Sequence, residues 1–204
     1  MHISWLGTTA VKLIARPVSE DVLVTIDTYK PEKGNFPRSF TPNIALFTRG
    51  EKDMATLSGD PFILTAAGEC EVKGVLISAI PGDAENTTIL RLDAEQLSVG
   101  HLGLIKKALS NEQLEMLGGV DILFVPVGGG KTYDSEMAIK MINEIEPRIV
   151  IPMAFYSDTD PDLAAVDGFL KEMGASKGSE EKKVILKKKD LPTEDMQVIV
   201  LGKE

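Results

Sequence analysis

The side chains that most often carry chemistry are scarce in this chain. It contains two histidines, His2 and His101, and one cysteine, Cys70. Catalytic zinc is usually held by several nitrogen, sulfur or oxygen donors, often histidines, so two imidazoles cannot supply a three-histidine or dinuclear site. Cys70 or a serine could pair with His101 as nucleophile and base, but neither lies in a nucleophile motif. We interpret His101 as a hydrogen-bonded structural residue.

The segment from Gly128 to Thr132 reads Gly-Gly-Gly-Lys-Thr and ends like a phosphate-binding loop. In such loops, backbone amides and a lysine surround phosphate oxygens. However, Val125 stands where the motif has its first glycine, and Asp134 is placed to cap the next helix. Its carboxylate would occupy the helix N-terminus that attracts phosphate. We favour a tight turn and keep weak nucleotide-phosphate binding as an alternative.

Carboxylates are the remaining candidate metal donors, because hard cations prefer oxygen ligands. The first half of the chain is richest in them, with Glu51, Asp53, Glu69, Glu71, Asp83 and Glu85. Each has a neighbour that could neutralise it. We therefore interpret most of these acids as ordinary surface charges.

Composition narrows the classes of protein further. The 204 residues fit one domain over 1–204. The 31 acids outnumber the 22 Lys and Arg, for a net charge of −9, which argues against nucleic acid as a partner. The longest uncharged stretch, residues 1–11, is shorter than the about 18 apolar residues of a membrane span. With a single cysteine and no secretory signal, we expect a cytoplasmic protein without a membrane partner.

Many short strands are expected to position these groups. Alternating apolar residues over 2–6 and 10–14 predict a hairpin. Residues 30–42 contain three prolines and a glycine, so we expect a loop without a regular ladder. Further strands are predicted at 22–26, 44–47, 62–65, 70–72, 75–80, 87–92 and 97–99.

Helices and strands alternate in the second half. Ser110 and Gln113 form a capping box for a helix that ends at Gly118. Further helices are predicted from Asp134 through Ile145 and from Asp160-Pro161 to Gly174. Strands are predicted at 122–127 and 149–151, and a final strand pair is predicted at 182–189 and 196–201. This order predicts an α/β protein in which two sheets pack face to face with helices outside.

An ordered set of short phrases runs through the chain: Ile-Ser-Trp-Leu-Gly at 3–7, Ile-Asp at 26–27, and the segments 68–74, 101–103, 120–129, 149–153 and 188–192. Together they resemble the metallo-β-lactamase superfamily, in the branch similar to ascorbate-6-phosphate lactonase-like hydrolases. The resemblance covers essentially the whole chain. It implies an αββα four-layer sandwich, in agreement with the order of elements.

The resemblance fails at the metal ligands. In active relatives a His-x-His-x-Asp-His motif follows the strand that matches 44–47. Of the four metal-ligand positions in this motif, only the one at Asp53 holds the expected residue type here. The positions that the resemblance gives to metal ligands are Arg49, Glu51, Asp53, Met54, Ala84, Leu104 and Ala154. Thr8 stands where a further histidine often follows Trp-Leu-Gly. Relatives use zinc, but these replacements predict no metal and no cofactor in this protein.

Arg49 would place a permanent cation where a metal dication should bind. With the metal lost, Glu51 and Asp53 would need positive partners. We predict that Arg49, with Lys52 or Lys131, pairs with these carboxylates.

The sequence therefore favours a metal-free pseudoenzyme with a binding or assembly role and an unidentified small-molecule ligand. A residual pocket could contain Thr8, Asp27, His101 and Lys131. Relatives frequently self-associate, so the resemblance implies a homo-oligomer. Two alternatives stay open. One is a hydrolase of a small phosphorylated, ester or lactone metabolite with a metal held by oxygens of Asp27, Glu51 and Asp53. The other is weak nucleotide-phosphate binding through Gly128–Thr132.

Overall fold

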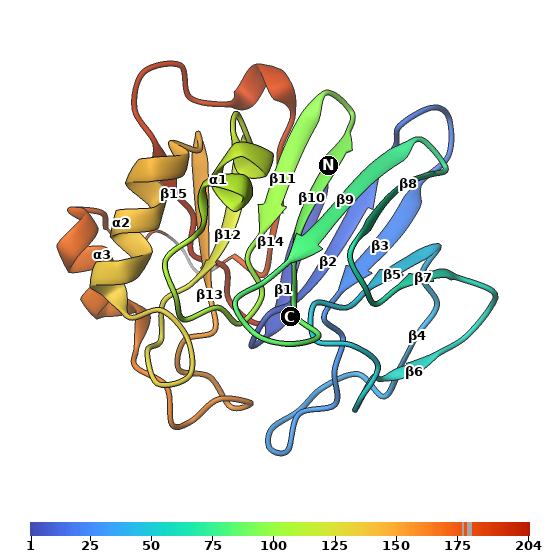
Figure 1. Cartoon of the computed structure of the whole chain (residues 1–204), viewed down its shortest axis with the longest axis horizontal. Coiled ribbons are helices and arrows are strands. Elements are labelled where there is room, and N and C mark those ends of the chain that lie inside the picture. The colour runs from blue at the N-terminus through green and yellow to red at the C-terminus, as the bar shows by residue number, and fades with distance from the viewer. Residues whose placement is uncertain (177, 179–180) are drawn as a thin grey trace.

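Two β-sheets packed face to face build the core of the protein (Figure 1). The computed structural model describes residues 1–176, 178 and 181–204. One sheet has six strands in the order β14-β1-β2-β3-β5-β7, and the other has seven in the order β15-β13-β12-β11-β10-β9-β8. Buried apolar side chains from both sheets form one continuous cluster.

Antiparallel strands make up the first half of the six-stranded sheet, and parallel strands extend it. Its members are β1 (His2–Gly7), β2 (Ala10–Ala15), β3 (Val22–Ile26), β5 (Ile44–Leu46), β7 (Phe62–Leu64) and β14 (Lys183–Ile185). β5 pairs in parallel with both β3 and β7. The hairpin and the strand predicted at 22–26 are confirmed.

The seven-stranded sheet changes from antiparallel to parallel pairing at β11. Its members are β8 (Gly68–Val72), β9 (Val75–Pro81), β10 (Thr88–Ala94), β11 (Leu97–His101), β12 (Ile122–Pro126), β13 (Ile149–Met153) and β15 (Gln197–Val198). Every residue of β12 and β13 is buried, as expected of strands covered on both faces.

The segment 30–42 contains one short strand that the sequence did not predict. β4 (Ser39–Phe40) pairs in parallel with β6 (Thr56–Leu57). This pairing fits between Pro37 and Pro42, because only two residues need to join the ladder.

Three α-helices and a short 3₁₀ turn accompany the seven-stranded sheet (Figure 1). They are α1 (Asn111–Leu117), α2 (Ser135–Ile145), α3 (Val166–Met173) and η1 (Lys188–Asp190). The Ser110 capping box of α1 and the Asp134 cap of α2 are confirmed. Among the described residues, no helix is both long and apolar enough to cross a membrane.

The predicted start of the third helix is wrong. α3 begins after Ala165, which makes no side-chain cap, although the helix ends at Gly174 as predicted. Asp160 cannot cap it because its carboxylate accepts hydrogen bonds from the Thr8 backbone N–H and hydroxyl. The Asp160 carboxylate therefore bonds a residue that is distant along the chain and does not cap α3.

The predicted final strand pair is also wrong, because its two members join different sheets. β14 pairs antiparallel with β1, whereas β15 pairs in parallel with β13. The Glu204 backbone N–H then donates to the Trp5 carbonyl, back at the six-stranded sheet. Residues 183–204 thus connect the two sheets.

Candidate functional site

A pocket of about 520 Å³ opens where the carboxyl ends of parallel strands from both sheets meet. Loops that follow β3 and β5 contribute one wall, and loops that follow β11, β12 and β13 contribute the other. Ends of parallel strands are where such folds commonly place their ligand sites. The lining includes Thr8, Asp27, Arg49, Asp53, Leu104 and Lys131.

Asp27 lies at the floor of this pocket with its side chain almost fully buried. Its Oδ1 accepts from the Thr48 backbone N–H at 2.7 Å, and its Oδ2 accepts from the Thr48 hydroxyl at 2.7 Å. Both carboxylate oxygens therefore already have a donor. The backbone of Asp27 has a positive φ of 53°, which turns the chain sharply at the end of β3.

Arg49 extends over the ring of Tyr29, with its guanidinium carbon 4.2 Å from the ring centroid. The Arg49 backbone N–H also donates to the Tyr29 hydroxyl at 2.8 Å, and that hydroxyl donates to the Gly50 carbonyl at 2.9 Å. Burial raises the pKa of Tyr29 well above its ordinary value, so the ring stays neutral. This geometry is a cation–π contact.

The predicted pairing of Arg49 with Glu51 and Asp53 is wrong. The ion pairs of the described residues include none from Arg49. Both acids are exposed, and Asp53 has a positive φ of 65°. The hydroxyl of Thr65 donates to Glu51 at 3.5 Å. After β5 both acids are exposed, Asp53 at the pocket lining, while Arg49 lies against Tyr29.

The other replaced positions are dispersed. Met54 is half-buried and packs against the cluster of Tyr29 and Phe47. Ala84 is exposed in a turn closed by Thr87, whose hydroxyl donates to the Ala84 carbonyl at 2.8 Å. Ala84 therefore does not line the pocket.

Thr8 lines the pocket at the turn of the opening hairpin, whereas Ala154 is fully buried behind it. The Ala154 N–H donates to the Thr8 carbonyl at 2.8 Å, and both residues have positive φ, 49° and 45° respectively. The Thr8 hydroxyl contacts both oxygens of Asp160, at 2.9 and 2.7 Å. Sequence analysis missed Asp160 here because its position before Pro161 indicated a helix cap.

His101 is fully buried and does not line the pocket. Its Nε2 lies 2.9 Å from the Thr9 carbonyl, and its Nδ1 accepts from the Gly103 N–H at 3.3 Å. These partners assign the proton to Nε2 in the neutral ring. Burial lowers the pKa of His101 from 6.5. Cys70 lies on β8, three strands from β11, so the two side chains cannot form a nucleophile–base pair.

The loop Gly128–Thr132 does not have the geometry of a phosphate cradle. The Gly129 N–H donates to the Tyr133 carbonyl, and the buried Thr132 hydroxyl donates to the Ile105 carbonyl at 3.0 Å. The Asp134 carboxylate caps α2. Lys131 is exposed at the pocket margin.

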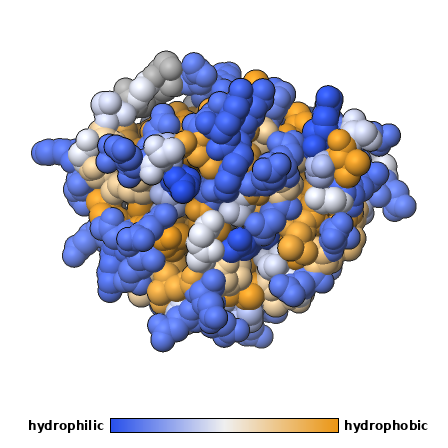
Figure 2. All heavy atoms as spheres, turned by 90° about the horizontal axis from the view of Figure 1, so that it is seen from above, coloured by the Kyte–Doolittle hydropathy of each residue, from blue (hydrophilic) through white to orange (hydrophobic). Residues whose placement is uncertain are grey.

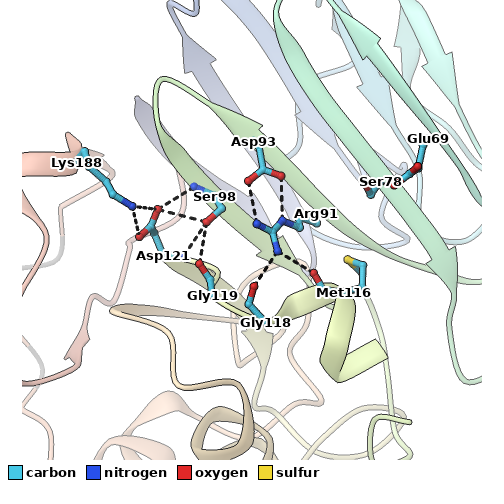
Figure 3. A network of polar contacts seen from close by, with 10 residues as sticks. All are labelled: Glu69, Ser78, Arg91, Asp93, Ser98, Met116, Gly118, Gly119, Asp121 and Lys188. Atoms are coloured by element: carbon cyan, nitrogen blue, oxygen red, sulfur yellow. Dashed lines mark hydrogen bonds and ion pairs between the residues drawn. The ribbon is translucent and has the colours of Figure 1, made fainter. Parts of the chain in front are cut away.

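A second polar cluster lies at the amino ends of the parallel strands β11 and β12 (Figure 3). The buried Asp121 carboxylate accepts from Lys188 Nζ at 2.8 and 2.9 Å and from the Ser98 backbone N–H at 3.0 Å. Nearby, Arg91 bonds Asp93 and the carbonyls of Met116 and Gly118. These contacts fix strands to α1 and η1.

The family model described as the beta-lactamase superfamily domain matches residues 2–154. This chain belongs to that superfamily. It is 39% identical over 66 residues to the UPF0173 protein PF0020 of Pyrococcus furiosus, a match that spans 31% of this chain and 30% of that relative.

Solved structures of the superfamily share the fold. A candidate Zn-dependent hydrolase of the metallo-beta-lactamase superfamily from Thermotoga maritima has a TM-score of 0.82 and 23% identity, and the match covers 99% of this chain and 100% of that chain. The metallo hydrolase Igni18 of Ignicoccus hospitalis has a TM-score of 0.64 and 17% identity, covering 91% and 99%. At these identities, the likeness shows the fold alone.

The residues present do not fit the metal centre that the superfamily implies. Throughout 1–176, 178 and 181–204, no three His, Cys, Asp or Glu side chains converge as metal ligands would. In the pocket, Asp27 already accepts two hydrogen bonds, and the guanidinium of Arg49 is a fixed positive charge. A divalent cation would meet repulsion from Arg49 and find few free donors.

Proposed function

We propose that this protein is a metal-free, catalytically inactive member of the superfamily that binds a small molecule in its pocket. The position of Arg49 carries this proposal. Its guanidinium lies over Tyr29 inside the pocket, at a position that the resemblance gives to a metal-binding histidine. A cation held there works against metal entry and against the activation of water that hydrolysis in this superfamily requires.

The hydrogen bonding of Asp27 supports the same proposal. Each of its two oxygens accepts a hydrogen bond from Thr48, which fixes the carboxylate against the turn after β5 and takes up part of its acceptor capacity. Asp53 lines the pocket but is exposed. The third acid of the oxygen-ligated alternative, Glu51, is exposed and is not part of the pocket lining.

Elemental analysis and hydrolysis assays test the proposal on the full chain. After dialysis against Zn²⁺ or Mn²⁺ and removal of free metal, we expect far less than one ion per chain. We also expect no hydrolysis of lactone, phosphodiester or thioester substrates above the buffer rate. Stoichiometric metal, or a rate that Asp53→Ala abolishes while Asp60→Ala preserves it, would establish the hydrolase instead. Asp60 is an exposed aspartate outside the pocket.

We also propose, from the resemblance, that the protein self-associates in the cytoplasm. Hydrophilic side chains spread over the face seen in Figure 2, with smaller apolar areas between them. Sedimentation equilibrium over a range of concentrations tests self-association, and a single species with the mass of one chain throughout would contradict it.

A further inference from the structure

The guanidinium of Arg49 lacks hydrogen-bond acceptors. Within the described part of the chain it makes no hydrogen bond and no ion pair, and its Nε is buried without a partner. A guanidinium carries five N–H donors in a planar fork. Buried polar groups of native proteins almost always have partners, so this group calls for an acceptor from outside the chain.

The surroundings of Arg49 hold the guanidinium in place for such an acceptor. The ring of Tyr29 lies beneath it, and the Tyr29 hydroxyl is fixed by the Arg49 backbone N–H and the Gly50 carbonyl. Tyr29 is itself buried. Stacking engages the face of the guanidinium and leaves the N–H groups at its edge available.

Other acids of the pocket do not serve Arg49. Asp27 and Asp160 accept hydrogen bonds from threonines, and Asp162 pairs with Lys33 at 3.5 Å. As many acidic as basic residues line the pocket. The pocket therefore does contain negative charge. What it lacks is a hydrogen-bond acceptor placed to pair with Arg49.

Four lysines also line the pocket, namely Lys30, Lys33, Lys52 and Lys131. Lys52 and Lys131 are exposed, and neither joins an ion pair among the described residues. Phe36 and Leu104 add apolar surface to the lining. A volume of about 520 Å³ is within the range of small-molecule sites.

We propose that Arg49 anchors a site for a small molecule that carries a carboxylate or phosphate group. The proposal rests on the proposed function, since it requires a pocket that is not a metal centre. Carboxylate and phosphate each accept two parallel hydrogen bonds from a guanidinium, which matches the unpaired donors of Arg49. Lys52 and Lys131 add charge attraction for the same group.

Calorimetric titration of the full chain with inorganic phosphate and with succinate, at constant ionic strength, tests this site. Wild type is compared with Arg49→Met, which keeps an unbranched apolar stem, and with Arg38→Met, which removes an exposed arginine outside the pocket. We expect saturable binding of at least one anion, weakened at least about tenfold in Arg49→Met and unchanged in Arg38→Met. Tighter phosphate binding would indicate a phosphate-bearing ligand, and tighter succinate binding a carboxylate.

The proposal is overturned if neither anion binds saturably at concentrations of about 10 mM, or if Arg49→Met binds as well as wild type. Thermal melting without anion separates a binding role from a structural one. An arginine kept for binding leaves the melting temperature of Arg49→Met within about 5 °C of wild type, because only the cation–π contact with Tyr29 is lost. A larger fall in melting temperature would show that Arg49 is a structural residue and would overturn the site.

Failure of this proposal is distinguishable from failure of the proposed function. Bound metal or hydrolysis would contradict the proposed function whatever the titrations show. Absence of anion binding in a chain that also binds no metal would remove the Arg49 site alone.

Discussion

At the scale of single residues, His101 shows how the core fixes a protonation state. The Nε2–H of its ring donates to the Thr9 carbonyl, and its Nδ1 accepts from the Gly103 N–H. Burial of the ring disfavours its charged form. The pKa in the folded protein is therefore below the ordinary value of 6.5. Between these two pKa values the unfolded chain binds a proton that the folded chain does not.

Stability should therefore decline as pH falls below about 6.5, by up to about 1.4 kcal/mol per pH unit until the folded-state pKa is reached. Melting temperatures measured from pH 7.5 to pH 5 would show this decline. We expect His101→Gln to flatten the pH dependence in that window and His2→Gln, at the other histidine, to leave it unchanged. Equal slopes in wild type and His101→Gln would contradict the assignment.

At the scale of elements, Gly128 marks a close approach between the loops that follow β12 and β13. A Cβ atom on Gly128 would lie 2.2 Å from the Ala154 carbonyl oxygen and 3.1 Å from the Phe155 Cα. Both neighbours are backbone atoms, which cannot move unless the two loops separate. Gly128 therefore serves this contact, whereas Gly129 and Gly130 serve the turn through their positive φ of 73° and 66°.

Gly128→Ala is expected to lower the free energy of unfolding by about 3 kcal/mol, because the loops must separate. Gly168→Ala is the matched control. Gly168 lies within α3, and a Cβ there meets only the Ser135 hydroxyl at 3.9 Å. That change should raise stability by about 0.5–1 kcal/mol through helix propensity. Urea denaturation measures both, and a neutral Gly128→Ala would show that the loops can separate freely.

Local patterns in the sequence predicted most elements but not their partners. Alternation identified the opening hairpin, and short polar signals identified the caps of α1 and α2, because these depend on neighbours within a few residues. The start of α3 failed because Asp160 bonds Thr8, which is distant along the chain. The prediction that β14 and β15 pair with each other was wrong for the same kind of reason. Each strand pairs with a strand that is distant along the chain, and the two partners belong to different sheets.

The pocket was predictable only in part. Thr8, Asp27 and Lys131 do line it, because they follow strand ends that the pattern located. Backbone turns decide where side chains point, however, and the positive φ of Asp53 was not visible in the sequence. Tyr29 was missed, although its place just after the end of β3 could have indicated a neighbour for Arg49.

At the scale of the whole molecule, one buried ion pair links the C-terminal segment to the seven-stranded sheet. Only 4% of the Asp121 side chain is exposed, whereas Lys188 is about half exposed. Removing the ammonium would leave a buried carboxylate with only the Ser98 groups and a distant Arg148 Nε at 4.0 Å. Breaking a buried pair from one side is strongly destabilising, and the exposure of Lys188 reduces the effect.

Lys188→Met is expected to destabilise the protein by about 1–3 kcal/mol in urea denaturation. Lys189→Met, at the next residue, should change stability by less than about 0.5 kcal/mol, because Lys189 joins no ion pair within the described residues. Similar effects of the two substitutions would show that the pair contributes little.

The pairing of β1 with β14 also matters while the chain is being synthesised. His2 leaves the ribosome well before its partner Ile185, which is translated only after the whole intervening segment. Until then, one side of β1 presents unpaired backbone groups that could recruit a strand from another nascent polypeptide. Such late closure slows folding, since distant segments must meet before either gains from the contact. Production at low temperature or with chaperones should therefore raise the soluble yield.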